Sequence, residues 1–226
     1  MANSDAISVP RGGLSEPRSE DRSLATSAER VFDIVFALAA LVFAAPLFIV
    51  LGILIRLDSA GPIVFTQTRV GQNGRRFHCY KLRSMVVDAP ARLDRLLAND
   101  PSARDEWARD HKLRNDPRIT AIGGFLRRSS LDELPQLFNI LRGDMSWVGP
   151  RPIVHEEIAK YGRWYRHYAR TKPGLTGMWQ VSGRNDVAYR RRIAFDILFA
   201  RSRSMRLYFY ILLMTIPAVL SRKGTY

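Results

Sequence analysis

Two adjacent carboxylates, Asp132 and Glu133, are the residues whose types and spacing best suit chemistry. The pattern Ser130-x-x-Glu133 also matches a capping box, so two acids at the start of a helix are the simplest interpretation. Pro135 adds a constraint, because proline is tolerated in a first helical turn but costs about 3 kcal/mol further inside. A helix must therefore begin close to Asp132 or be broken there. In either geometry free backbone N–H groups can hold phosphate beside a carboxylate that serves as nucleophile or Mg²⁺ ligand.

Arginines flank this pair on both sides in the sequence. Arg127 and Arg128 come five and four residues before Asp132. One guanidinium group can bind two phosphate oxygens at once through two N–H groups. The run Pro150-Arg151-Pro152 fixes the backbone around a third arginine. A solvated basic patch and a stiff turn are the ordinary alternatives for these two features. Together with the acids they fit attack of a carboxylate on phosphorus, with Mg²⁺ neutralising a diphosphate.

The composition leaves several anionic partners open. The 226 residues carry a net charge of +14, nearly all of it from arginine, which suits nucleic acid, acidic lipid headgroups or phosphorylated ligands. A membrane-tethered basic protein without enzymatic activity is therefore a rival hypothesis. A nucleic-acid-binding patch has no need of paired carboxylates or a rigid Pro-Arg-Pro loop, so nucleic acid is not the expected partner. Cys79 is the single cysteine, which excludes an intrachain disulfide.

A long apolar segment precedes the part of the chain that carries these residues. Residues 34–55 contain no charge, and about 20 apolar residues cross a bilayer core. A buried core helix is the alternative, although such a helix normally has one polar face. Pro46 lies mid-segment, and Arg30 and Arg56 flank it, so the charges indicate no orientation. A kinked transmembrane helix and a re-entrant helix that bends at Pro46 are equally consistent with these residues.

The sequence predicts three consecutive parts. Residues 1–29 are rich in Ser, Pro, Gly and charge and are expected to be disordered. Residues 30–57 form the membrane helix, and residues 58–226 form a single catalytic domain in the cytosol. Near the end, residues 207–220 are apolar but short, beside several arginines. They fit an amphipathic helix at the interface of an anionic membrane, or equally the last core helix of the domain.

The fold class predicted for the body is mostly α with a small β-hairpin. Residues 63–70 and 75–82 read as two strands joined by Asn73-Gly74, a strong signal for a two-residue turn. Helices are expected at 88–112, with a break near Pro101, and at 121–142, 153–170 and from 186 to the end.

Several longer motifs resemble one known family. The segments LDELPQLFNILRGDMSWVGPRP and KPGLTGMWQVSGRND, with RVFDIVFALAALVFAAPLF near the start, resemble the bacterial sugar transferases, the monotopic polyprenyl-phosphate phosphoglycosyl transferases. The match is closest to the short galactosyl-phosphate transferases of succinoglycan-type exopolysaccharide synthesis. The resemblance implies transfer of a sugar-1-phosphate from a UDP-sugar to undecaprenyl phosphate, with release of UMP. It also implies Mg²⁺ as cofactor and a place on the cytoplasmic face of the bacterial inner membrane.

The resemblance also implies a role for each matching residue. Asp132 corresponds to the nucleophile and Glu133 to the Mg²⁺ ligand. Arg127 corresponds to a phosphate-binding arginine, Pro150-Arg151-Pro152 to the loop that holds the nucleotide, and Pro46 to the bend of a re-entrant helix.

Two positions depart from the family pattern. Ala45-Pro46 stands where Ser-Pro is frequent, and Tyr208 falls on an acidic position of the last helix, whereas Asp196 matches another. Galactose follows from the closest resemblance, with glucose or an N-acetylated sugar as alternatives. Nothing in the sequence indicates an oligomeric state.

Overall fold

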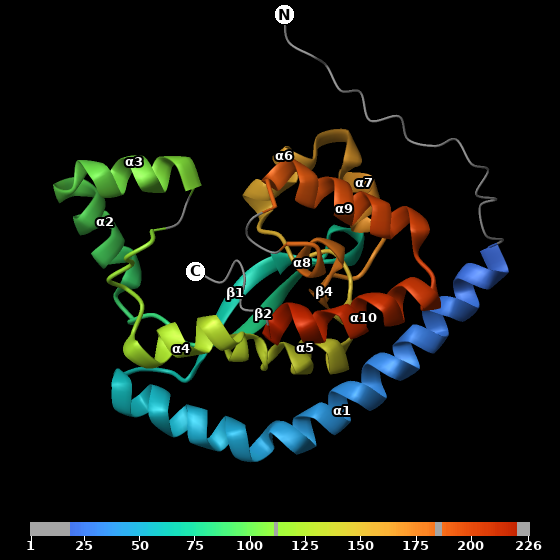
Figure 1. Cartoon of the computed structure of the whole chain (residues 1–226), viewed down its shortest axis with the longest axis horizontal. Helices are drawn as coiled ribbons and strands as arrows, with labels where there is room; N and C mark the ends of the chain where they lie inside the picture. The colour runs from blue at the N-terminus through green and yellow to red at the C-terminus, as the bar shows by residue number, and fades with distance from the viewer. Residues whose placement is uncertain (1–18, 111–112, 184–186, 221–226) are drawn as a thin grey trace, which may run out of the picture.

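The computed structural model describes residues 19–110, 113–183 and 187–220. The chain is mostly helical, with two small two-stranded sheets (Figure 1). The predicted fold class is confirmed in this coarse form, and the second sheet is an addition that the sequence pattern did not reveal. The helices and strands run, in chain order, α1 Ser19–Asp58, β1 Val64–Val70, β2 Arg76–Leu82, α2 Ala89–Asn99, α3 Pro101–Asp110, α4 Ala121–Ser129, α5 Gln136–Arg142, β3 Ser146–Val148, α6 Ile158–Tyr161, α7 Tyr165–Ala169, β4 Gly174–Thr176, α8 Met178–Val181, α9 Tyr189–Ser202 and α10 Met205–Leu220.

The helix α1 begins earlier than the sequence predicts. Residues 19–29, expected to be disordered, are helical, and residues 1–18 lie outside the described part of the chain. Contacts with the body explain the correction. Glu29 is buried in an ion pair with Arg203, and Arg30 donates hydrogen bonds of 2.6 and 2.8 Å to the carbonyl oxygens of Ile140 and Leu141. These contacts fix α1 against the body at Glu29 and Arg30, directly before the apolar part of the helix.

The apolar part of α1 lies along the underside of the body in Figure 1 and is largely exposed. Its most apolar window has a mean hydropathy of 2.9 and is only 17% buried, and Phe43 is 88% exposed. The core-helix alternative is therefore wrong, because a core helix would cover these side chains. By length and composition α1 is able to cross a membrane. Pro46 lies within the continuous helix, and the re-entrant arrangement stays a prediction.

The β-hairpin is confirmed, with a longer connection than predicted. β1 and β2 pair antiparallel from Val64 opposite Leu82 to Val70 opposite Arg76. The N–H of Gly71 donates to the carbonyl oxygen of Arg75 over 2.7 Å and closes the loop between them. Asn73 and Gly74 adopt the left-handed φ values of 56° and 74° that suit these residue types.

The predicted helix at 121–142 is broken at the carboxylates, as Pro135 indicated. α4 ends at Ser129, the next residue Ser130 has a φ of +58°, and Leu131–Glu133 form a single 3-10 turn before α5 begins at Gln136. Gly123 brings α4 against the end of β2, because a Cβ atom there would lie 2.0 Å from the carbonyl oxygen of Ser84. This close approach fixes the first turn of α4 beside the end of the hairpin.

Two other predicted helices are divided. The segment 153–170 consists of short helical turns, α6 and α7, separated at Gly162, whose φ of +49° interrupts a helix. The last helix splits into α9 and α10 at Arg203, whose side chain turns to Glu29. The break near Pro101 between α2 and α3 is confirmed. The pair α2–α3 stands apart from the body at the left of Figure 1.

The helix α10 combines features of both interpretations offered for residues 207–220. Tyr208 and Ile211 are buried in the core, whereas Tyr210, Leu213 and Ile216 are exposed. The helix therefore packs by one side and presents an apolar surface on another.

Candidate active site

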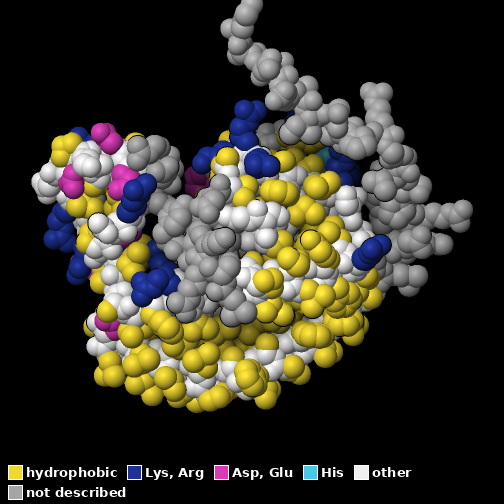
Figure 2. Space-filling model, viewed as in Figure 1, with side chains coloured by type: hydrophobic (Ala, Val, Ile, Leu, Met, Phe, Trp, Pro, Cys, Tyr) yellow, Lys and Arg dark blue, Asp and Glu magenta, His cyan; other side chains and the backbone are white. Residues whose placement is uncertain are grey.

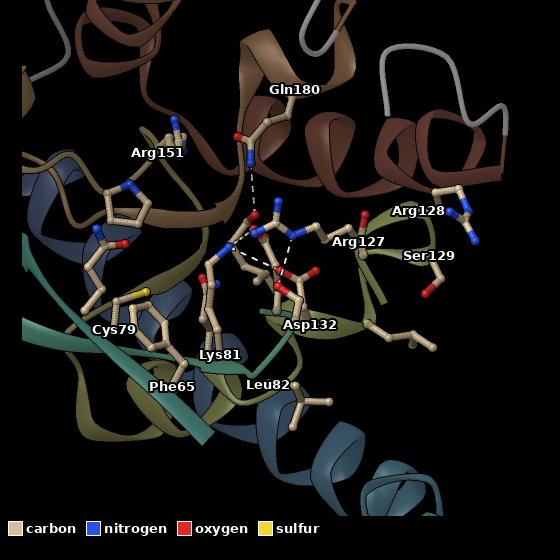
Figure 3. Close-up of a pocket in the computed structure, with 18 of the residues that line it drawn as sticks. Phe65, Cys79, Lys81, Leu82, Arg127, Arg128, Ser129, Asp132, Arg151 and Gln180 are labelled. Atoms are coloured by element: carbon tan, nitrogen blue, oxygen red, sulfur yellow. Dashed lines mark hydrogen bonds and ion pairs between the residues drawn. The ribbon is translucent and has the colours of Figure 1, made fainter. Parts of the chain in front are cut away.

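The structure places Asp132 and Glu133 around one ammonium group. The Nζ atom of Lys81 lies 2.8 Å from Oε1 of Glu133 and 3.5 Å from Oδ2 of Asp132 (Figure 3). Asp132 is buried, with 8% of its surface exposed, on the 3-10 turn between α4 and α5. Lysine neutralises part of the charge that two adjacent carboxylates would otherwise accumulate in a poorly solvated position.

Lys81 was missed by the reasoning from sequence, and strand alternation could have found it. Phe77, Cys79 and Lys81 alternate along β2, and the first two are buried, so the lysine lies on an inward face. Asn139 of α5 docks on this strand. Its side chain donates to the carbonyl oxygen of His78 over 2.7 Å and accepts from the N–H of Tyr80 over 3.1 Å. These hydrogen bonds fix the lysine relative to the carboxylates.

The two carboxylates have different electrostatic surroundings. Burial raises the pKa of Asp132, the charge of Glu133 raises it further, and Lys81 offsets only part of this. Burial would also raise the pKa of Glu133, but Lys81 and Arg151 together hold that pKa below its ordinary value. Glu133 is therefore the more firmly ionised acid, suited to hold a cation. By exposed surface Asp132 is the more buried carboxylate, and it must be ionised to act as a nucleophile.

Arg127 lies where its sequence position predicts. It belongs to the last turn of α4, and its Nε atom donates to Oγ of Ser84 over 3.0 Å. In Figure 3 its guanidinium group points toward Asp132 and Lys81, whereas Arg128 points away. Arg127 is thus oriented to contact a phosphate bound at the carboxylates.

The Pro150-Arg151-Pro152 loop is held by backbone contacts on both sides. The carbonyl oxygen of Pro150 accepts from the N–H of Gly174 over 2.8 Å, and that of Pro152 accepts from Nη1 of Arg69 over 3.1 Å. Gly174 is required here because a Cβ atom would lie 2.0 Å from the nitrogen of Gly149. The buried Arg69, from β1, is a second supporting residue that the sequence reasoning missed.

Arg151 lies beside a small group of acids and phenols. A small cavity is lined by Arg151, Glu157, Asp196 and neighbouring aromatic residues. The hydroxyl of Tyr161 donates to Oδ2 of Asp196 over 2.6 Å, and burial raises the pKa of Asp196 to about 7. Asp196, expected to match an acidic family position, thus lines this small cavity with Arg151 and does not line the cleft that holds Asp132 and Glu133.

One open cleft joins these features. It is lined by Asp132, Glu133, Arg127, Arg151 and Pro152, among other residues, and has a volume of about 3140 Å³. Sites for one drug-sized ligand commonly have about 300–1,000 Å³. The cleft therefore has room for two substrates at once. Pro150 is fully buried and supports the loop from behind.

Comparison with known proteins gives the family. The model of the family described as "Bacterial sugar transferase" matches residues 24–222. The chain belongs to the bacterial sugar transferase family. The resemblance noted in the sequence is thereby confirmed.

Similar sugar transferases carry informative names. The chain is 51% identical to "Undecaprenyl-phosphate galactose phosphotransferase" of Salmonella typhimurium over 88% of this chain and 41% of that protein. It is 43% identical to "Exopolysaccharide production protein ExoY" of Rhizobium meliloti over 91% of each chain. It is 37% identical to "UDP-glucose:undecaprenyl-phosphate glucose-1-phosphate transferase" of Xanthomonas campestris pv. campestris over 88% of this chain and 40% of that protein. The chain thus spans about two fifths of the first and third relatives and most of the second.

Tyr208, one of the two positions of this sugar transferase expected to depart from the family pattern, lies outside the cleft lining. Its hydroxyl donates to Oδ1 of Asp33 on α1 over 2.8 Å. The same carboxylate accepts from Oγ of Ser146 and the N–H of Trp147 over 2.9 and 3.0 Å. Tyr208 therefore belongs to the junction of α1 with the body, and Pro46 likewise does not line the cleft.

The site fits a magnesium ion held jointly with substrate. Within the described residues no group of three or more His, Cys, Asp or Glu forms a metal cage. Mg²⁺ typically uses one or two carboxylates together with substrate phosphates and water. Lys81 engages Oε1 of Glu133 and Oδ2 of Asp132, so the second oxygen of each carboxylate can serve as a ligand.

Proposed function

We propose that this protein transfers a sugar-1-phosphate from a UDP-sugar to undecaprenyl phosphate, as the first membrane step of exopolysaccharide synthesis. The observation that carries the proposal is the pairing of the buried Asp132 and its neighbour Glu133 with the ammonium group of Lys81, in a cleft that Arg127 and Arg151 also line. Family membership and the printed names of the relatives support the same reaction class.

The proposed reaction has two displacements at one phosphorus. An oxygen of Asp132 attacks the phosphorus that carries the sugar, and the bond to the oxygen bridging the two phosphates breaks, so UMP leaves with that oxygen. An oxygen of the lipid phosphate then attacks the same phosphorus and displaces the carboxylate of Asp132, which is regenerated. Lys81 and Arg127, which lie beside Asp132, would neutralise the oxygens of that phosphate. Glu133 would hold Mg²⁺ together with the substrate, and the ion would further neutralise the diphosphate.

The proposed sugar is galactose. Support comes from the relatives, because the one named for galactose transfer is 51% identical whereas the one named for glucose transfer is 37% identical. Glucose and N-acetylated sugars belong in the same assay as competitors.

The proposed location is the cytoplasmic face of the bacterial inner membrane. In this arrangement α1 bends at Pro46 and returns to the face that it entered, and α10 lies at the interface beside anionic lipid. The exposed apolar side chains of α1 and α10 support membrane contact at both helices.

The full-length protein with Mg²⁺, undecaprenyl phosphate and a panel of UDP-sugars tests the reaction. UMP is the expected product, whereas UDP would indicate an ordinary metal-dependent glycosyltransferase.

Without acceptor, the intact protein should gain the mass of one phosphosugar, and Asp132→Asn should form no adduct. Absence of UMP with every sugar, or undiminished release by Asp132→Asn, would refute the proposal. Salt-sensitive DNA binding without turnover would favour the rival basic protein.

A further inference from the structure

The helix α10 is apolar on two sides, and only one of them is used for packing. Tyr208 and Ile211 are 1% and 0% exposed in the core. Oγ1 of Thr215 lies 2.8 Å from Oγ1 of Thr176 on β4, which fixes the rotation of the helix. Leu213 and Ile216, three positions apart, are nevertheless 65% and 60% exposed. These two side chains form an apolar stripe that the protein core does not require.

The stripe of Leu213 and Ile216 borders the same cleft as the carboxylates. Both residues line it together with Asp132 and Arg127, and Leu212 and Val219 extend the apolar wall. In Figure 3 the dark red ribbon of α10 passes behind the two arginines of α4. The phosphates of a nucleotide diphosphate are matched by arginine side chains and make no use of an exposed hydrocarbon wall.

The apolar wall is connected to α1. Phe36, 46% exposed on α1, also lines the cleft. Nearby, Phe32 packs edge-on against Phe209 of α10, with ring centroids 4.8 Å apart. Figure 2 shows apolar side chains covering the lower face, where α1 lies, and rising toward the middle of the molecule. An apolar path therefore leads from the helix able to enter a membrane toward Asp132.

The charged end of this path lies at α4. Arg127 and Arg128 lie in the last turn of α4 and line the cleft, and Arg127 points toward Asp132. A site with cations at one end and hydrocarbon along the rest matches an amphiphile with a phosphate head and an apolar chain. We infer that the stripe of Leu213 and Ile216 holds the hydrocarbon chain of the polyprenyl phosphate acceptor, with its phosphate at the end of the cleft where Arg127 faces Asp132. The inference rests on the proposed function and adds the acceptor subsite to it.

Kinetics of the two half-reactions test this subsite. Leu213→Ser and Ile216→Ser change exposed side chains, and Phe43→Ser, on α1 and outside the cleft lining, is the matched control. All are assayed in mixed micelles of fixed composition. We expect the KM for undecaprenyl phosphate to rise about three- to tenfold in each α10 variant, because apolar contact area is lost. UMP release without acceptor, and the KM of the control, should stay at the wild-type level.

Photochemical labelling gives a readout that is independent of turnover. A polyprenyl phosphate with a diazirine in its chain should label the peptide that contains residues 212–219 of the wild-type protein. A phosphatidylcholine with the same group should label α1 more strongly than this peptide.

Four results would overturn the inference. These are an unchanged acceptor KM in both α10 variants, an equal rise in Phe43→Ser, slower UMP release without acceptor, and equal labelling of residues 212–219 by the phospholipid. The last result would identify the stripe as a general bilayer contact. A wild-type protein that releases no UMP from any UDP-sugar would instead refute the proposed function itself.

Discussion

Tyr208 on α10 donates a hydrogen bond of 2.8 Å to Asp33 on α1, across 175 positions of sequence. Both residues are buried, and Asp33 also accepts from Ser146 and from the backbone of Trp147. Relatives were expected to carry an acid at the position of Tyr208. The tyrosine is explained here because its hydroxyl donates a hydrogen bond to the buried carboxylate of Asp33. The carboxylate pair of the cleft does not depend on it.

Replacing Tyr208 tests that assignment. Tyr208→Phe removes one donor to a buried carboxylate and should lower the free energy of unfolding by about 1–3 kcal/mol. UMP release per folded molecule should stay within about twofold of wild type, since no reacting group is touched. Denaturant unfolding and single-turnover assays measure the two effects, with the exposed Tyr210→Phe as control. A well-folded Tyr208→Phe protein with a large loss of turnover would show that Tyr208 acts in the reaction.

Lys81 should be essential for turnover. Lys81→Met leaves two adjacent carboxylates without their ammonium partner, so we expect a fall in UMP release of roughly 100-fold or more. The pKa of Asp132 should rise further, which moves the acidic limb of the pH–rate profile to higher pH. Lys160→Met, which changes an exposed lysine at the rim of the same cleft, is the control. Equal effects of the two substitutions would contradict the role of Lys81.

Asp196 should make stability depend on pH. Burial raises its pKa from 3.8 to about 7, although Tyr161, Arg151 and Arg192 favour the ionised form, and Glu157 opposes it. The folded protein therefore holds this proton more tightly than the unfolded chain. The contribution to stability is complete below about pH 4 and is lost as pH rises through about 7. Asp196→Asn should flatten the dependence of Tm on pH over this range, and an unchanged slope would assign it to other groups.

The contact of α4 with β2 predicts opposite outcomes for two neighbouring glycines. Gly123→Ala places a Cβ atom 2.0 Å from the backbone of Ser84, so α4 must move, and Arg127 with it. Gly124→Ala meets only the flexible end of Arg128 at 3.2 Å and gains helix propensity. We expect Gly123→Ala to lower both Tm and UMP release, and Gly124→Ala to retain both. Equal stability of the two variants would contradict the close packing.

The chemistry-bearing turn was predictable because its signals are local. Pro135 lies three residues from Asp132, and the rule that proline ends or begins a helix applies within one turn. Lys81 is 51 residues from Asp132, and only the register of the hairpin against α5 brings them together. No short-range pattern in the sequence specifies that register.

The misjudged helices have the same physical origin. At the break between α9 and α10, Arg203 pairs with Glu29, which is 174 residues away. The parallel pairing of β3 with β4 joins Ser146 to Gly174 across the intervening turns. Helical periodicity predicts which side of a segment is apolar, and it carries no information about contacts with residues so distant in the sequence.

The first half of α1 is part of the fold of the catalytic body. Arg30 bonds to the last carbonyl groups of α5, Asp33 gathers three donors, and Ala37 is fully buried beside Leu137 and Ile140. Removal of α1 would therefore leave the three groups that donate to Asp33 without their acceptor, and it would expose the core beside Ala37. Deletion of α1 is therefore not expected to yield a folded, water-soluble catalytic fragment. The protein must be purified with its apolar helix, in detergent or in nanodiscs.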